Sequence, residues 1–146
     1  MFDLKKASSI ESNSKAEAKT DYILIVDDEE INRLALSEML QRDYNVETAK
    51  TGREALEKIK EQEFGVVVAD HRMPGMTGVE LFIELERQNT LSSKIVLTGF
   101  ADLNSVVSAV NEGKIYNYLK KPIKGDDFRL AVRQAMSHFK MKISNR

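Results

Sequence analysis

The chain alternates between short apolar runs and segments of helical periodicity, from Asp21 to about residue 143. Runs such as Tyr22–Val26 and Val66–Ala69 are rich in β-branched residues and suit strands buried on both faces of a sheet. Strands that alternate with helices need right-handed crossovers, so the pattern predicts a doubly wound α/β fold with a parallel sheet. We expect strands at 22–26, 46–49, 66–69, 95–97 and 115–119, and helices around 32–40, 55–59, 79–85, 106–110 and 128–139.

This alternation occupies most of the chain. Of the 146 residues, 42% are apolar and 31% are charged, which is ordinary for one globular domain. Residues 1–20 have few large apolar side chains to offset the entropy of ordering, so we predict a flexible N-terminal tail. Residues 21–143 form the predicted domain and 144–146 its C-terminal end. We expect no output domain within the chain.

Charge and composition exclude several classes of function. The 22 basic and 23 acidic residues give a formal net charge of −1, so we expect no direct binding to nucleic acid. The absence of cysteine excludes disulfides and thiolate metal sites, and two histidines are too few for a histidine metal site. No apolar stretch approaches the roughly 18 to 20 residues of a membrane helix, and no secretory signal begins the chain. We expect a cytoplasmic protein without membrane insertion.

Four polar signals lie where predicted strands stop. They are Asp27-Asp28, Asp70, Thr98 and Lys121-Pro122. Open α/β sheets place their binding sites at the carboxyl ends of the strands, so these side chains are expected to meet at one edge. Three carboxylates there suit Mg²⁺, which takes oxygen ligands and accepts a phosphate oxygen as a further ligand. The signals together predict a phosphate and metal site.

Each signal also has a structural interpretation that the residues alone leave open. Asp27 and Asp28 could cap the following helix, because acids are favoured at and just after a helix start. Asp70 could be a nucleophile toward phosphorus, giving an aspartyl phosphate, or could simply begin a turn. Thr98 is also a common type of strand residue, and Lys121 could be an ordinary surface lysine. Near a phosphoryl group, Lys121 could instead pair with its oxygens.

Two neighbours of these signals are left out of the predicted site. His71 follows Asp70 in the turn, and it has no partner histidine for metal binding or phosphotransfer. Lys120 precedes Lys121, and alternation along a strand sends the two side chains to opposite faces. We therefore interpret His71 as a turn residue and Lys120 as a surface residue.

Together these segments resemble the receiver domain of two-component response regulators. The resemblance rests on ILIVDDEE, VVVADHRMPGMTG, KIVLTGF and YNYLKKPI, in that order along the chain. It covers about residues 21–143, and the ordered combination is far more specific than any one motif. It implies a single-domain (βα)5 fold with the flavodoxin-like strand order 2-1-3-4-5, and a function in phosphorelay signal transduction.

The resemblance implies a role for each acidic residue. Asp70 would accept a phosphoryl group from a histidine kinase. Asp27, Asp28 and Asp70 would hold Mg²⁺, or Mn²⁺ in its place, with the backbone carbonyl of Arg72 as a further ligand. The domain would be no enzyme but a phosphoacceptor that takes part in its own phosphorylation and slow dephosphorylation.

The resemblance also implies a switch. Thr98 would bond to the phosphoryl group and Lys121 would pair with it, while Tyr118 matches the aromatic residue that turns inward. The surface of the fourth helix, fifth strand and fifth helix would then change its shape. The Lys121-Pro122 bond would be cis, as in only about 5% of X-Pro bonds.

Arg72 and Phe100 depart from the small polar residues most common at their positions in receivers. They follow Asp70 and Thr98 by two residues, where they would flank the path of the attacking water. We hypothesise that their bulk slows loss of the phosphoryl group and lengthens the signal.

The implied partners are a sensor histidine kinase or phosphotransfer protein on one side, and a downstream protein target or a missing output domain on the other. The segment TGFADLNSVVSAVNEGKIYNYLKKP also resembles receivers attached to transcriptional activators or cyclic-dinucleotide phosphodiesterases. Whether the chain is a whole protein or an excised domain stays open, as does the formation of a homodimer through the switching surface.

Three other functions compete with this interpretation. A haloacid-dehalogenase-type Mg²⁺ phosphatase needs its nucleophile and acid two residues apart after the first strand, whereas Asp27 and Asp28 are adjacent. A flavodoxin-like cofactor binder needs a glycine-rich phosphate loop after that strand, and this chain has none there. A receiver-like scaffold that is never phosphorylated would not need the complete set of acids, threonine and lysine.

Overall fold

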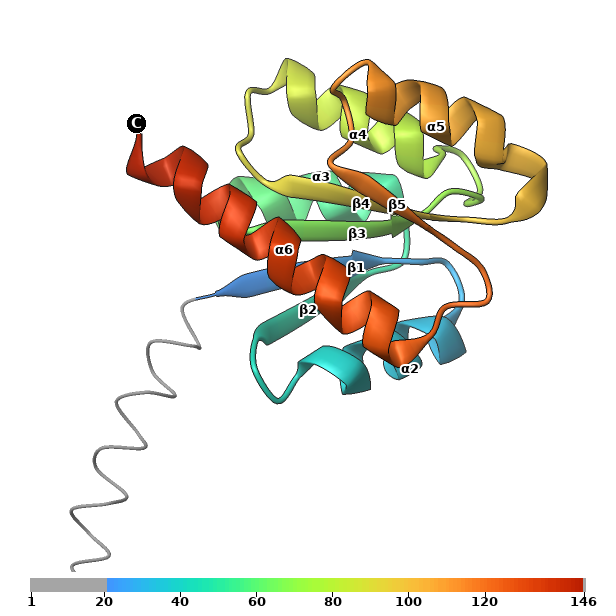
Figure 1. Cartoon of the computed structure of the whole chain (residues 1–146), viewed down its shortest axis with the longest axis horizontal. Helices are drawn as coiled ribbons and strands as arrows, with labels where there is room; N and C mark the ends of the chain where they lie inside the picture. The colour runs from blue at the N-terminus through green and yellow to red at the C-terminus, as the bar shows by residue number, and fades with distance from the viewer. Residues whose placement is uncertain (1–20, 146) are drawn as a thin grey trace, which may run out of the picture.

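Five parallel strands form the centre of the molecule (Figure 1). The computed structural model describes residues 21–145, and the predicted tail at 1–20 lies outside them. The strand order β2-β1-β3-β4-β5 confirms the predicted flavodoxin-like topology. In the shared register, Leu24 of β1 lies opposite both Glu47 and Val67. The strands are β1 (Tyr22–Val26), β2 (Asn45–Ala49), β3 (Val66–Asp70), β4 (Ser93–Thr98) and β5 (Asn117–Lys120).

Helices cover both faces of the sheet (Figure 1). One face packs against α2 and α6, and the other against α3, α4 and α5, so the central strands are buried on both sides. The helices are α2 (Glu30–Leu40), α3 (Gly52–Glu61), α4 (Gly78–Arg87), the 3-10 helix η1 (Phe100–Asp102), α5 (Leu103–Asn111) and α6 (Gly125–Ser144). Among residues 21–145, no helix is long and apolar enough to cross a membrane.

Alternate strand positions supply two apolar cores, one on each face of the sheet. Leu24 packs with α3, α4 and α5, whereas its neighbour Ile25 packs with α2 and α6. Phe82 of α4 and Phe128 of α6 are completely buried, each in its own layer. Burial of a side chain of this size contributes roughly 1.5–3 kcal/mol. The two cores bury the central strands on both faces, and the ends of the strands carry the polar residues.

The predicted strand at 95–97 is shorter than β4, because the prediction excludes the charged residue Lys94, which lies inside the strand. Lys94 is only 2% exposed. Its ammonium group donates to Glu86 Oε1 at 3.0 Å and to the Ser92 carbonyl oxygen at 2.9 Å. A buried charge with such partners is tolerated, so the lysine does not end the strand.

β5 begins two residues later than the predicted strand at 115–119. Ile115 packs into the core beside α5, and the ring of Tyr116 stacks on His138 of α6 with 4.7 Å between the ring centroids. The apolar character of these two residues therefore reflects packing of the loop before β5 rather than extension of the strand.

Candidate functional site

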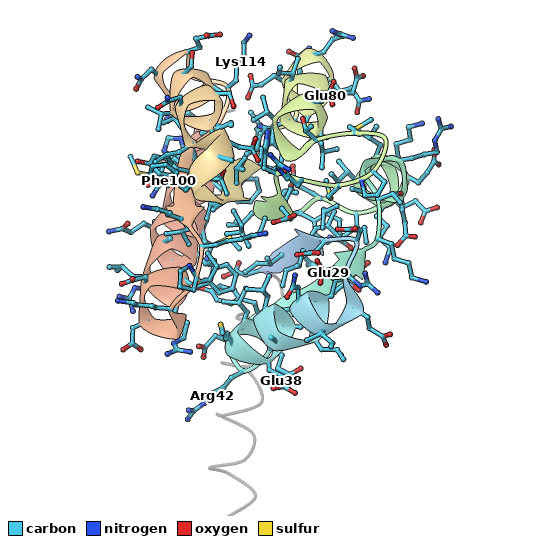
Figure 2. All side chains as sticks on the ribbon, turned by 90° about the vertical axis from the view of Figure 1, so that its right-hand side faces the viewer. Glu29, Glu38, Arg42, Glu80, Phe100 and Lys114 are labelled. Carbon is cyan, nitrogen blue, oxygen red and sulfur yellow. The ribbon has the colours of Figure 1, made fainter. Side chains whose placement is uncertain are left out.

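The carboxyl ends of four strands bring the predicted site residues to one edge of the sheet. In chain order these residues are Asp27, Asp28, Asp70, Thr98 and Lys121. Figure 2 faces this edge and labels Glu29, just before α2, and Phe100, at the start of η1. Because the strands are parallel, side chains that lie far apart in the sequence meet here.

Three carboxylates form a compact acidic cluster. Oxygen atoms of Asp27, Asp28 and Asp70 all lie within 4.8 Å of one another. Asp27 and Asp70 are only 2% and 4% exposed, whereas Asp28 is open to solvent. Three negative charges this close repel one another, and a divalent cation relieves the repulsion. The cluster combines oxygen donors with an exposed side, so it fits Mg²⁺, which keeps several of its waters when bound.

Asp27 is held by the main chain at the start of α2. Its Oδ1 accepts a hydrogen bond from the N–H of Glu29 at 2.9 Å, and its carbonyl oxygen accepts one from Arg33 at 2.7 Å. Glu29 is the residue that caps α2, and no side chain bonds to the helix there as a cap. Helix capping therefore does not explain the acid pair. Burial raises the pKa of Asp27, and the charge on Asp70 acts in the same direction.

The main chain of Asp70 packs tightly against the start of α4. The N–H of Gly78 donates to the carbonyl oxygen of His71 at 3.0 Å, and a Cβ atom at Gly78 would lie only 2.8 Å from the carbonyl oxygen of Asp70. Thr77 caps α4 in a capping box, in which its Oγ1 accepts from the N–H of Glu80 and its own N–H donates to Glu80 Oε1. The turn after β3 is thereby fixed, and Asp70 with it.

Thr98, at the end of the neighbouring strand β4, and Lys121, just after β5, lie on the same side of Asp70. The ammonium group of Lys121 forms an ion pair with Asp70, and its side chain is 41% exposed. Thr98 is 1% exposed, and its hydroxyl group donates to the carbonyl oxygen of Gly99 at 3.1 Å. The N–H of Lys121 donates to the carbonyl oxygen of Thr98 at 2.8 Å, and the Lys121-Pro122 peptide is cis. The structure thus places a cation and a hydroxyl group beside a buried carboxylate.

Two further residues lie on β5 next to these groups. Tyr118 is half-buried against the core on the side of α3, α4 and α5. Lys120 is exposed and makes no ion pair with the acidic cluster; its ammonium group lies 5.1 Å from the centroid of the Phe100 ring. Of the two adjacent lysines, Lys121 is the one that reaches Asp70.

Arg72 and Phe100 are both exposed, with 73% of the Arg72 side chain and 79% of Phe100 accessible to solvent. Arg72 forms an ion pair with Asp102, with 2.7 Å between Nε and Oδ2. The sequence does not predict this ion pair of Asp102. Nothing in the chain marks it, because its partner lies 30 residues away in another loop.

A family model for the response regulator receiver domain matches residues 23–133. The chain belongs to this family. This receiver domain is 36% identical over 114 residues to the hydrogenase transcriptional regulatory protein HoxA of Cupriavidus necator, and 33% identical over 118 residues to the transcriptional regulatory protein ZraR of Escherichia coli. The alignments cover 78% and 80% of this chain but 24% and 26% of those proteins. The chain thus spans about a quarter of the length of these curated relatives.

Solved structures share the fold of this receiver domain. One is described as adenylate cyclase from Rhodopirellula baltica, with a TM-score of 0.81, 35% identity, and coverage of 86% of this chain and 93% of that one. Another is a response regulator receiver domain protein from Clostridium thermocellum, with a TM-score of 0.77, 30% identity, and coverage of 83% and 98%. The family and the fold implied by the sequence motifs are confirmed.

Proposed function

We propose that this receiver domain accepts a phosphoryl group on Asp70 from a sensor histidine kinase or a phosphotransfer protein. The observation that carries the proposal is the meeting of three carboxylates with Lys121 and Thr98 at one edge of the sheet. Mg²⁺, or Mn²⁺ in its place, would be held by Asp27, Asp28 and Asp70 with the backbone carbonyl of Arg72, and would offset the negative charge of the carboxylates and phosphoryl oxygens.

The transfer step uses the buried carboxylate as the nucleophile. An oxygen of Asp70 attacks phosphorus, an oxygen–phosphorus bond forms, and the phosphorus–nitrogen bond to the donor histidine breaks with its electron pair on that nitrogen. Lys121 already pairs with Asp70, so its ammonium group is placed to pair with the new phosphoryl oxygens. The hydrogen bond from Gly78 to His71 and the close approach of Gly78 to the Asp70 main chain would keep the nucleophile in position during the transfer.

Phosphorylation would act as a switch because it adds about −1.5 to −2 charges at the site. The hydroxyl group of Thr98, which donates to the carbonyl oxygen of Gly99 in this structure, would turn to donate a hydrogen bond to the phosphoryl group. Its movement gives the half-buried Tyr118 room to turn inward, which reshapes the surface formed by α5, β5 and α6. A downstream protein or an output domain would read that surface, through which two copies of the domain could also pair.

The side of α2 next to the site supports docking of a phosphodonor protein. Ile31 and Leu34 of α2 are 79% and 57% exposed, which is unusual for large apolar residues. A groove along α2, lined by other residues of the helix, reaches the site and includes Asp27, Leu36 and Lys121. Exposed apolar residues on α2, together with a groove that reaches the carboxylates, suit a helical partner that carries a phosphohistidine. A cytoplasmic location and the absence of direct nucleic-acid binding stay predictions.

Arg72 and Phe100 are proposed to lengthen the lifetime of the phosphoryl group. Both side chains are exposed, Arg72 in the loop after Asp70 and Phe100 at the start of η1, two residues after Thr98. We expect Arg72→Asn and Phe100→Glu to lose the phosphoryl group faster than the wild type. Unchanged lifetimes in both variants would contradict this role.

The proposal is tested by incubating the full chain with Mg²⁺ and acetyl phosphate and measuring the intact mass. We expect one added phosphoryl group in the wild type and in Asp43→Ala, whose exposed carboxylate lies between α2 and β2. Asp70→Ala should show none. The proposal fails if the wild type gains no phosphoryl group from acetyl phosphate or from any histidine kinase, which would favour a scaffold. Rapid turnover of a generic phosphate ester would favour the phosphatase.

A further inference from the structure

The segment that follows Thr98 has few anchors of its own. None of the residues of η1 is buried, and Phe100 is 79% exposed. Two main-chain hydrogen bonds hold the turn, a long one from the N–H of Asp102 to the carbonyl oxygen of Gly99 at 3.4 Å and one from the N–H of Leu103 to the carbonyl oxygen of Phe100. A segment of this kind is held in place by contacts to other elements or is free to open.

One such contact is an ion pair with the loop that follows Asp70. Arg72 donates to Asp102 through Nε at 2.7 Å and through Nη2 at 3.4 Å, so the pair has a two-point geometry. Asp102 is 21% exposed in its side chain. The hydrogen bond from Arg72 holds the pKa of Asp102 below its ordinary value, and the charges of His71 and Lys121 act in the same direction. The Asp102 carboxylate therefore lies within electrostatic reach of the site.

A second contact fastens the segment from the opposite side. The ammonium group of Lys120 lies over the ring of Phe100, 5.1 Å from its centroid, in the geometry of a cation–π interaction. Lys120 is the residue before Lys121 on β5. The segment is therefore tied both to the loop of the phosphorylated residue and to the strand of the phosphate-pairing lysine.

We infer that Asp102 is a positioning residue that sets the lifetime of the aspartyl phosphate by holding Arg72 across the gap between the two loops. This inference rests on the proposed phosphorylation of Asp70. In dephosphorylation, a water oxygen attacks phosphorus, the phosphorus–oxygen bond to Asp70 breaks, and inorganic phosphate leaves with the two protons of the water while the carboxylate is regenerated. Water must enter between the loops, so a tether that closes them together slows the step.

The test measures loss of the phosphoryl group from the full chain. The protein is phosphorylated with Mg²⁺ and acetyl phosphate, the donor is removed, and the intact mass is followed over time. For Asp102→Ala we expect dephosphorylation about 1.5- to 5-fold faster than in the wild type, the factor that corresponds to an exposed ion pair. Asp126→Ala is the matched control, because it removes a similar exposed ion pair with Arg129 on α6 and should leave the rate unchanged.

Two further measurements separate positioning from a general structural effect. High salt should speed dephosphorylation of the wild type but not of Asp102→Ala, because only the wild type has the ion pair to screen. The double variant with Arg72→Asp and Asp102→Arg should recover the lifetime, since it restores the pair with its charges exchanged.

Hydrogen exchange of the unphosphorylated protein tests the tether without any chemistry. Amides of residues 99–102 should exchange faster in Asp102→Ala than in the wild type. Unchanged exchange, or unchanged dephosphorylation in a variant that is phosphorylated normally, overturns the inference and leaves the proposed function standing. A wild type that cannot be phosphorylated overturns the proposed function and the lifetime role together.

Discussion

Replacing Gly78 with alanine tests the close packing between α4 and the end of β3. A Cβ atom at residue 78 would lie 2.8 Å from the carbonyl oxygen of Asp70 and 3.2 Å from the Cα atom of His71. Both neighbours are main-chain atoms and cannot rotate away, so the backbone must shift. Overpacking of this kind costs about 1–3 kcal/mol. Because the shift displaces Asp70, we also expect slower phosphorylation by acetyl phosphate.

Urea denaturation followed by circular dichroism measures the change in the free energy of unfolding. Gly99→Ala is the matched control, because a Cβ atom there has nothing within 4 Å and the φ of −87° is open to alanine. At such a position alanine stabilises by about 0.4–1 kcal/mol through the unfolded chain. The two variants should therefore differ in sign. The reasoning is refuted if Gly78→Ala is as stable as the wild type, or if both variants lose stability equally.

Three further predictions concern buried charges and a helix cap. Burial and the charge on Asp70 raise the pKa of Asp27, so its ionised form opposes folding above that pKa. Asp27→Asn should therefore raise the free energy of unfolding at pH 7 in urea titrations. The variant should also lose the stabilisation that Mg²⁺ gives the wild type, about 1.4 kcal/mol at a Mg²⁺ concentration of ten times Kd. An unchanged response to Mg²⁺ would contradict the metal assignment. Glu86→Ala leaves the buried ammonium group of Lys94 without its carboxylate partner, with the Ser92 carbonyl oxygen as the remaining acceptor, and should cost about 1–3 kcal/mol in the same experiment, more than Lys94→Met. Thr77→Ala removes the cap of α4 and should cost about 1 kcal/mol by thermal unfolding.

The topology is predictable from the sequence because its main determinant is local. A strand buried on both faces must be apolar along its whole length, and Val66–Ala69 shows this before Asp70 ends the run. The starting residues of β4 and β5 are harder to predict from the sequence. Lys94 continues β4 only because Glu86, on another element, neutralises it. Ile115 is apolar because it packs in the core, not because it lies in a strand.

The site is predictable in outline for a similar reason. Parallel strands end at one edge, so polar residues that stop apolar runs are brought together whatever their separation in the chain. The sequence does not tell which of two adjacent acids is buried, and the structure buries Asp27 while Asp28 stays exposed. The ion pair between Arg72 and Asp102 is equally hard to predict from the sequence, because it depends on how the segments after β3 and β4 lie relative to each other.

The hydrogen bond from the N–H of Lys121 to the carbonyl oxygen of Thr98 has a mechanical consequence. The two groups proposed to sense the phosphoryl group do not sit on independent loops, since this bond extends the β4–β5 ladder past the last paired residues, Thr98 and Lys120. A displacement of the main chain at either residue therefore also displaces the other. Under the proposed function, the domain would respond as one cooperative unit with two arrangements, rather than through two adjustments that could occur separately.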